Sequence, residues 1–273
     1  MNAMVNSLNS KPDIWAFFDI DQTAIKGYTK KDGKLYVREN GKPFFTGEVW
    51  AYVLRDQDVI DNEAFVYMLE PWLKFANSEY TPGQTACETN KHYLEVMKGK
   101  KYSELVCIAK RELAPRAIPD PLLKVAYVVF KGHTHPTLGV VTNVYDEICQ
   151  GFNDAGIILN NSELRICNKI KVINDKLSDA YEMDVSRGKS THFLECLKKN
   201  NIPYEQMFCF GDSYPMDAWV KLGFYAFGAG PSESMQKFVE LHDGKPILEG
   251  ERNRRAFAKR LLLAIKTMKG EKP

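Results

Sequence analysis

The stretch WAFFDIDQT, residues 15–23, places two aspartates directly after an apolar run. Asp19 and Asp21 are separated by one residue, and Thr23 follows two positions later. The apolar run, extended by Ile14, predicts a buried strand, and the two-residue repeat of a strand puts both carboxylates on the same side. Two like charges held this close are unfavourable unless something positive lies between them. The positive object could be a metal ion, a lysine or a shared proton.

Other polar residues come at the ends of further predicted strands. Thr142 and Asn143 end the apolar segment LGVVTN, while Asp212 follows the segment MFCFG and Asp217 comes shortly after it. Lys189 opens a predicted helix just before that last strand. Ligands of open parallel sheets bind beyond the carboxyl ends of the strands, so we expect all these groups to converge on one crevice.

The chemistry that suits this set of groups is phosphoryl transfer. Carboxylate oxygens with few other ligands suit Mg²⁺, which keeps several waters and accepts phosphate oxygens. An aspartate neutralised by the metal can attack phosphorus and form an aspartyl phosphate. In-line transfer also needs positive charge around the equatorial phosphate oxygens, which Mg²⁺ and Lys189 would supply.

Alternating strands and helices would position these groups. Apolar runs predict strands at 14–18, 136–143, 163–175, 207–213 and 224–230. Helical spacing predicts helices over 145–156, 189–201 and 232–241. This alternation predicts an α/β fold with a doubly wound, Rossmann-like parallel sheet and helices on both faces.

A short β excursion is predicted to follow the first strand. Residues 28–47 contain Asp32-Gly33 and Asn40-Gly41, two dipeptides that favour tight turns. The segment KLYVRE between them has the composition of a strand, so we expect a β-hairpin flap here.

Residues 48–118 have a different character and predict a helical cap inserted into the α/β core. Several of their segments show helical apolar spacing, interrupted at Thr81-Pro82-Gly83. The α/β core would then comprise residues 1–47 and 119–273. Aromatic side chains are frequent in the cap, and they could either shape a substrate pocket or form the cap's own core, which is the interpretation we favour: Trp50, Tyr67, Trp72, Phe75 and Tyr80.

The last segment, 251–273, predicts a basic C-terminal helix. Phe257, Leu261, Ile265 and Met268 recur along one face, and the other face is rich in Arg and Lys. This pattern is typical of a helix packed on a core with its basic face in solvent. The alternative is a helix that contacts a membrane surface or a partner.

Composition limits the classes of function. With 44% hydrophobic and 26% charged residues and a net charge of +2, the chain is typical of globular proteins and has no strong attraction to nucleic acid. No apolar run reaches the roughly 18 residues of a membrane span, and no basic region followed by an apolar stretch predicts a secretory signal. The six cysteines are scattered without zinc-type spacing. We therefore expect a reduced, cytoplasmic protein whose cysteines fill the core.

The motifs DIDQT (19–23), VVTN (140–143), GK (188–189) and GDSYPMD (211–217), in this order, resemble the four motifs of the haloacid dehalogenase superfamily. Those motifs are DxDx[TV], a Thr or Ser that ends a strand, a Lys, and an acidic pair. The segments MKGKKYSELVCIAKREL, ELRICNKIKVIND and RGKSTHFL further resemble the phosphoserine-phosphatase-like subfamily, which implies a mobile helical (C1) cap.

This resemblance implies roles for the acidic residues. Asp19 would be the nucleophile, and Asp21 would be the general acid and base whose backbone carbonyl also binds Mg²⁺. Asp212 would supply the other carboxylate to the metal. Asp217 would hold a metal-bound water or orient Lys189.

The remaining motif residues would bind the phosphate. The resemblance assigns this role to Thr142 and Lys189, with Lys189 also steadying Asp19, and makes Asn143 a weaker candidate for a phosphate or substrate contact. It thus implies a Mg²⁺-dependent hydrolase of a small phosphorylated metabolite. A phosphotransferase or mutase would use the same residues. A non-catalytic phosphate-binding regulatory protein is a third reading, against which the intact Asp19, Asp21, Lys189 and Asp212 argue.

One departure from the subfamily concerns the substrate. Phosphoserine phosphatases carry an acidic residue soon after the first motif to hold the substrate ammonium. Here the segment AIKGYTKKDGK has no acid before Asp32. The sequence therefore argues against phosphoserine itself.

Overall fold

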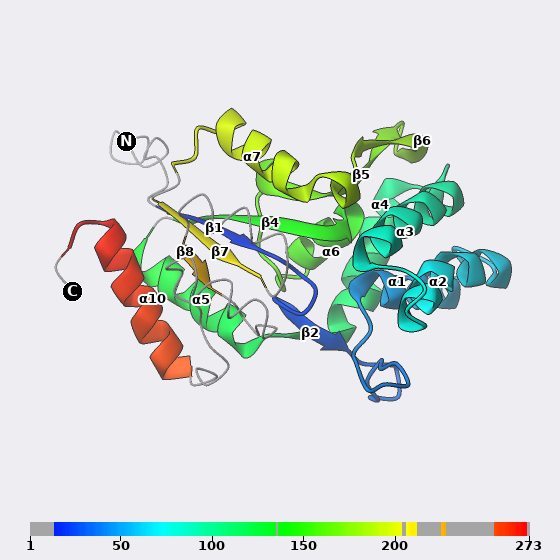
Figure 1. Cartoon of the computed structure of the whole chain (residues 1–273), viewed down its shortest axis with the longest axis horizontal. Coiled ribbons are helices and arrows are strands. Elements are labelled where there is room, and N and C mark those ends of the chain that lie inside the picture. The colour runs from blue at the N-terminus through cyan, green and yellow to red at the C-terminus, as the bar shows by residue number, and fades with distance from the viewer. Residues whose placement is uncertain (1–13, 135, 204–205, 212–224, 228–253, 272–273) are drawn as a thin grey trace, which may run out of the picture.

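The computed structural model describes residues 14–134, 136–203, 206–211, 225–227 and 254–271. Within these residues a six-stranded sheet has the order β6-β5-β4-β1-β7-β8. Its strands are β1 (Ile14–Phe18), β4 (Pro136–Tyr145), β5 (Arg165–Ile173), β6 (Lys176–Met183), β7 (Met207–Phe210) and β8 (Tyr225–Phe227). Neighbouring strands are parallel except β5 and β6. The predicted doubly wound parallel sheet is confirmed, with one antiparallel strand added at its edge (Figure 1).

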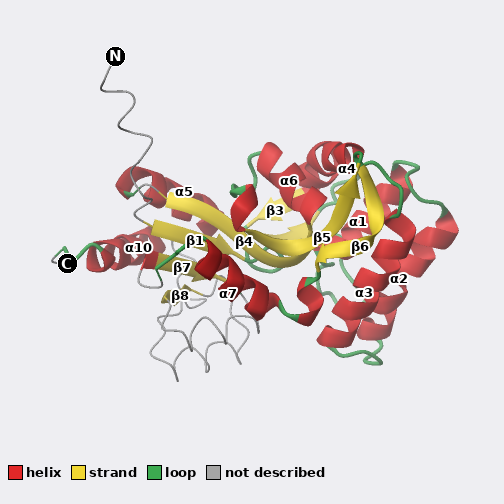
Figure 2. Ribbon diagram, turned by 90° about the horizontal axis from the view of Figure 1, so that it is seen from above, coloured by secondary structure: helices red, strands yellow, loops and turns green. Residues whose placement is uncertain are grey.

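Both faces of the sheet are covered by helices, which explains the continuous apolar run of β1. Trp15 and Phe17 face α7 (Lys189–Lys199), where Phe17 meets Phe193 edge-to-face at 4.9 Å. Phe18 faces the opposite way, toward Tyr127 of α5 (Pro121–His133). Figure 2 shows α7 and α5 on opposite sides of the strands.

The basic C-terminal segment forms α10 (Arg254–Met268), which packs along α5 (Figures 1 and 2). Phe257, Leu261 and Ile265 are buried, and Met268 lies partly buried against the same cluster. The predicted apolar face is thus confirmed as a packing face. The predicted helix at 232–241 lies outside the described residues.

The helices of the predicted insertion lie together beyond one end of the sheet (Figure 2). They are α1 (Thr46–Asp56), α2 (Asn62–Ala76), α3 (Pro82–Met97) and α4 (Tyr102–Ile108), and α4 runs on into a π-helical turn, Ala109–Leu113, and a 3₁₀ turn, Ala114–Arg116. The predicted break at residues 81–83 is the start of α3: Thr81 accepts the N–H of Gln84, and Pro82 occupies the first turn. The division into core and cap is consistent with this arrangement and stays a prediction.

The predicted flap differs from a regular hairpin. Both turns form, with positive φ at Gly33 (+82°) and Gly41 (+77°), but KLYVRE makes only isolated bridges. The paired strands here are β2 (Ile25–Tyr28) and β3 (Ala117–Pro119), which run antiparallel. Leu35 and Val37 are 52% and 44% exposed while Tyr36 between them is buried, so one face of the segment packs on the core, although its strand pairing is limited to isolated bridges.

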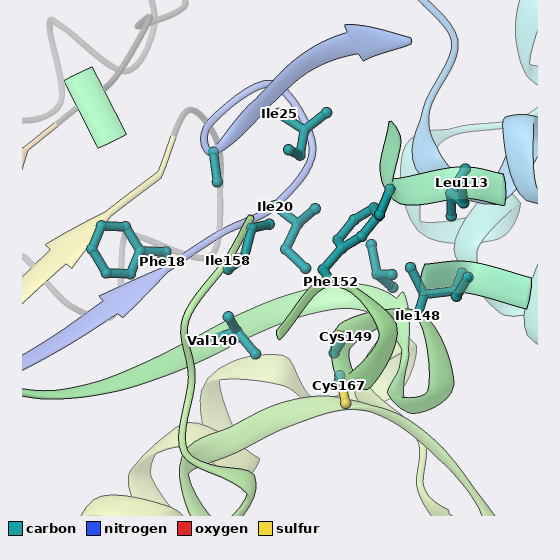
Figure 3. Packing of buried hydrophobic residues seen from close by; sticks show 14 of the residues in the cluster. Phe18, Ile20, Ile25, Leu113, Val140, Ile148, Cys149, Phe152, Ile158 and Cys167 are labelled. Carbon is teal, nitrogen blue, oxygen red and sulfur yellow. The ribbon is translucent and has the colours of Figure 1, made fainter. Parts of the chain in front are cut away.

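A dense apolar cluster supports the carboxyl end of β1. Figure 3 shows Phe18 and Ile20 with Val140 of β4 and with Phe152 of α6 (Asp146–Asp154). Cys149 and Cys167 are buried in the same cluster and Cys209 is buried in a second cluster, whereas Cys87 and Cys196 are half-buried and Cys107 is exposed, so the expectation that cysteines fill the core holds for three of the six. In the described ranges, no helix is long and apolar enough to cross a membrane.

Candidate active site

Asp19 lies at the point where β1 ends, and the sheet itself fixes its position. Its N–H donates to the carbonyl of Phe210 on β7 at 2.8 Å, and its Oδ1 accepts the N–H of Ile20 at 2.8 Å. The Nζ of Lys189 lies 3.4 Å from the same Oδ1, and both side chains are about nine-tenths buried. A lysine therefore lies beside the first aspartate.

Lys189 reaches Asp19 from the first residue of α7. The backbone amides of a helix N-terminus carry partial positive charge, which adds to that of the ammonium group at this place. Arg187, two residues earlier, has a side chain that is 79% exposed and pairs with Asp184 instead. The cation that contacts the aspartate is therefore Lys189.

Asp21 is held by a different element, the first turn of α1. Its Oδ1 accepts the backbone N–H of Thr46 at 2.8 Å and the Thr46 hydroxyl at 2.5 Å. The Thr46 hydroxyl also contacts the phenol oxygen of Tyr28 at 2.6 Å. The Asp21 carboxylate is thus anchored to the inserted helices as well as to β1.

Burial raises the pKa of Asp21 to about 6. The hydrogen bonds from Thr46 act in the opposite direction, and the nearby charge of Asp19 raises the pKa further. A carboxyl with such a pKa can both donate and accept a proton near neutral pH, which general acid–base catalysis requires.

The carboxyl end of β4 contributes Thr142 and Asn143. Thr142 is buried, and its hydroxyl accepts the N–H of Val144 at 3.4 Å. Asn143 is exposed, and its carbonyl accepts a hydrogen bond from the side chain of Asn168 at 2.6 Å. The hydroxyl and the amide predicted from the sequence therefore stand at the same sheet edge as Asp19.

One cavity of about 730 Å³ joins these groups. The predicted site residues that line it are Asp19, Asp21, Thr142, Asn143 and Lys189. The predicted metal ligands Asp212 and Asp217 lie outside the described residues. The structure thus brings together the five predicted side chains that it describes, and their roles remain to be tested.

Much of the cavity wall comes from the inserted helices, and two of the cap aromatics follow the less favoured prediction that they shape a pocket. Trp50 is fully buried, as expected of a residue in the core of the cap, but Trp72 and Phe75 line the cavity. Phe45, just before α1, lines it too. Other lining residues absent from the sequence prediction include Gln22, Thr85, Thr89, Asn90, Ser186 and Ser190.

A buried polar cluster ties the insertion to the two loops of the site. Asn90 of α3 and Asn168 of β5 exchange side-chain hydrogen bonds of 2.8 and 3.0 Å. Asn90 also donates to Asp184 at 2.7 Å, and Asn168 accepts the N–H of Val185 at 3.1 Å. Together with the bond to the Asn143 carbonyl, these contacts fix both the end of β4 and the approach to Lys189.

The carboxylate of Asp19 fits the role of a ligand to a divalent cation. Its Oδ1 is engaged by Ile20 and Lys189, and within the described part of the chain its Oδ2 has no hydrogen-bond partner. A carboxylate oxygen without another partner suits a hard cation such as Mg²⁺. Across the described ranges, no three His, Cys, Asp or Glu residues are grouped as a metal site.

Comparison with known proteins places the fold. No family model and no curated protein matches the sequence. A hydrolase of the haloacid dehalogenase family from Salmonella enterica serovar Typhi matches with a TM-score of 0.52 and 10% identity, over 88% of this chain and 68% of that one. An apo phosphoserine phosphatase matches with a TM-score of 0.52 and 14% identity, over 90% and 98% of the two chains.

A third solved structure, a cytosolic 5′-nucleotidase IIIB bound to cytidine, matches with a TM-score of 0.56 and 11% identity. That match covers 94% of this chain and 87% of the nucleotidase. At these identities the likeness shows the fold alone. The chain has the fold shared by haloacid dehalogenase family hydrolases and phosphoserine phosphatases, as the motif resemblance implied.

Proposed function

We propose that this protein is a Mg²⁺-dependent phosphatase that hydrolyses a small phosphomonoester through an aspartyl-phosphate intermediate. The observation that carries the proposal is the pair formed by Asp19 and Lys189, 3.4 Å apart, with Asp21 on the wall of the same cavity. A nucleophile beside a cation and an acid–base group with a pKa near 6 are the parts that phosphoryl transfer needs.

In the first step an oxygen of Asp19 forms a bond to phosphorus, and the bond from phosphorus to the ester oxygen breaks. Asp21 in its protonated form gives its proton to the departing oxygen, which leaves as an alcohol. The ammonium of Lys189 and the N-terminal amides of α7 balance the negative charge on the phosphoryl oxygens. Thr142 and Asn143 would hold the phosphoryl group in line.

In the second step Asp21, now ionised, removes a proton from water as the water oxygen attacks phosphorus. The bond from phosphorus to Asp19 breaks, and inorganic phosphate is released with Asp21 protonated again. Mg²⁺ held by Asp19, Asp212 and the Asp21 carbonyl would neutralise charge on the nucleophile and the phosphoryl oxygens.

The first experiment measures phosphate release from a panel of phosphomonoesters with Mg²⁺ and with a chelator. Wild-type protein should release phosphate only with the metal, and Asp19→Asn should lower turnover by at least about a thousandfold because it removes the nucleophile. Asp32→Asn is the matched control, since Asp32 is exposed and pairs with Lys34 outside the cavity.

The same experiment distinguishes the alternative functions. Transfer of phosphate to an added alcohol in preference to water would identify a phosphotransferase. Equal turnover by Asp19→Asn and wild type would overturn the proposed mechanism. Absence of any reaction with Mg²⁺ bound would favour a non-catalytic phosphate-binding protein.

A further inference from the structure

The two ends of the cavity have different chemistry. Asp19, Asp21 and Lys189 define the end where the phosphoryl group would react. The inserted helices supply an aromatic wall, which we define as Phe45, Trp72 and Phe75. In this wall the rings of Phe45 and Trp72 lie 5.3 Å apart, and those of Phe45 and Phe75 lie 6.5 Å apart. Figures 1 and 2 show that the inserted helices lie at the sheet end that bears the site.

Among the lining residues that the structure describes, formal charge is confined to the end where the phosphoryl group would react. Among the described lining residues, no side chain other than Asp19, Asp21 and Lys189 carries a formal charge. A leaving group with an ammonium would find no anionic side chain among the described lining residues beside the aromatic wall, and the Arg38 guanidinium that stacks on Phe45 and Phe75 is already paired with Glu48. Because burying an unpaired charge is strongly unfavourable, the wall favours an uncharged leaving group.

A quaternary ammonium is the cation that aromatic walls bind best, but this wall already has a cation on it. The guanidinium carbon of Arg38 lies 4.8 Å from the ring centroid of Phe45 and 6.0 Å from that of Phe75. Arg38 forms an ion pair with Glu48, which holds it in this place. A positively charged ligand would share these rings with a positively charged residue.

Two of the residues that line the cavity carry buried polar atoms without hydrogen-bond partners in the described part of the chain. The indole N–H of Trp72 and the hydroxyl of Thr89 are buried and make no hydrogen bond to any described residue. Both residues line the cavity. Both atoms are themselves fully buried, so a ligand in the cavity would contact the aromatic rings and not these two groups.

The volume of the cavity favours the same kind of leaving group. The cavity volume of about 730 Å³ falls in the range of roughly 300–1,000 Å³ typical of pockets that enclose drug-sized ligands. A molecule as small as phosphoserine would leave most of this space to water. A phosphate ester with a ring system attached would fill it.

We propose that the leaving group of the substrate carries an uncharged aromatic ring, which stacks on the aromatic wall while the phosphate faces Asp19. This inference rests on the proposed phosphatase function for its catalytic meaning, but its binding test does not require turnover. Nucleoside 5′-monophosphates belong to this class, because each has an aromatic base that is uncharged near neutral pH and a primary phosphate ester.

The test is calorimetric binding to Asp19→Asn protein with Mg²⁺, a variant chosen so that ligands are not consumed. Adenosine and cytidine 5′-monophosphates are compared with ribose 5-phosphate, which has the same kind of ester without the ring, and with phosphocholine. At least one ring-bearing ester should bind tenfold or more tightly than ribose 5-phosphate, since stacking on an aromatic side chain has an effect of this size. Phosphocholine should bind no better than ribose 5-phosphate.

A second variant tests whether the preference for ring-bearing esters arises from the aromatic wall. Introducing Trp72→Leu into the Asp19→Asn protein should bring the affinities for ring-bearing and ring-free esters within about threefold of each other. Leu73→Ala is the matched control, because Leu73 is the next residue of α2, is 58% exposed and does not line the cavity. If Trp72→Leu does not fold, Phe75→Leu replaces it in the same comparison.

The outcomes separate this inference from the proposed function. Tighter binding of a ring-bearing ester, lost with Trp72→Leu and kept with Leu73→Ala, supports the inference whether or not wild-type protein hydrolyses the ester. Equal binding of ring-bearing and ring-free esters overturns it, as does a preference for phosphocholine. Hydrolysis of ribose 5-phosphate with no binding preference would retain the phosphatase and reject the aromatic substrate.

Discussion

Thr46 donates both its backbone N–H and its hydroxyl to one carboxylate oxygen of Asp21, at 2.8 and 2.5 Å. Because Thr46 is the first residue of α1, this contact joins the proposed acid–base group to the inserted helices. Thr46 has no exposed surface, so water cannot replace its hydroxyl. The position of the insertion and the proton affinity of Asp21 are therefore linked.

Replacing Thr46 by Val should shift the pH dependence of catalysis. The Thr46 side-chain hydrogen bond lowers the pKa of Asp21, so its loss should raise that pKa above about 6. Since kcat/KM requires protonated Asp21 to assist the leaving group, the alkaline limb of its pH profile should move to higher pH. The profile is measured against Thr46→Ser, which keeps the hydroxyl and should match the wild type. If the pH profiles of Thr46→Val and Thr46→Ser coincide, the Thr46 hydroxyl does not set the pKa of Asp21.

Asp21 should titrate near pH 6 in the metal-free protein. Burial is the main cause of its raised pKa, and burial does not depend on substrate. The measurement is a ¹³C NMR titration of the aspartate carboxyl resonances, with Asp21→Asn used to assign the signal. Exposed Asp32 is an internal reference, because its hydrogen bonds with Lys34 lower the pKa of its carboxyl. An Asp21 midpoint at or below the usual value near 4 would contradict the burial seen here.

Much of the fold can be predicted from local patterns of apolar residues in the sequence. The apolar runs of β1, β4 and β7 are buried on both faces, so their composition identifies them as central strands. Their parallel order then brings the polar residues after each strand to one edge. For this reason the amino-acid sequence is enough to place Asp19 and Thr142 in one site.

The parts that were missed depend on contacts between distant segments. β6 is mostly polar because only Leu177 is buried, and the turn before it is Asn174-Asp175, both with positive φ, without the usual Gly. Trp72 and Trp50 have the same helical environment in sequence, yet one lines the cavity and the other fills the core. Only the packing of the insertion on the sheet separates them.

Because of Glu147, the free energy of unfolding should decrease as pH rises. Its carboxylate is buried at the start of α6 and accepts a hydrogen bond from Tyr93, whose hydroxyl in turn accepts the N–H of Trp50 at 2.9 Å. Burial raises the pKa of Glu147 to about 7 from its ordinary value of 4.5. Between these values the folded protein keeps a proton that the unfolded chain has released, so folding is favoured at the lower pH.

The free energy of unfolding of the wild type should therefore decrease by up to roughly 3 kcal/mol from this group as pH rises from 4.5 to above 7. Glu147→Gln cannot ionise and should lack this contribution. The measurement is urea unfolding of both proteins at pH 5 and pH 8, and the difference between them isolates Glu147 from other titrating groups. Parallel pH dependence in the two proteins would show that the buried carboxyl keeps an ordinary pKa.

Asn168→Ala should weaken phosphate binding although Asn168 does not line the cavity. The side chain, 1% exposed, donates to the Asn143 carbonyl at 2.6 Å and accepts the Val185 N–H at 3.1 Å. Its loss removes a hydrogen-bond partner from the Asn143 carbonyl, the Val185 N–H and the Asn90 side chain, which should lower the free energy of unfolding by at least about 2 kcal/mol. The end of β4 and the segment leading to Lys189 would then no longer be held in one arrangement.

Two measurements separate this positioning effect from simple destabilisation. The inhibition constant of inorganic phosphate should rise by about tenfold or more at a temperature where the variant is still folded, since the loss of a single buried contact near a site has effects of this order. Asn161→Ala is the control, because Asn161 caps the 3₁₀ turn Ser162–Leu164 and lies on the surface away from the cavity. A lower melting temperature with unchanged phosphate inhibition would assign Asn168 to stability alone, whereas a change in both would show that the junction between insertion and sheet holds the phosphate-binding loops in place.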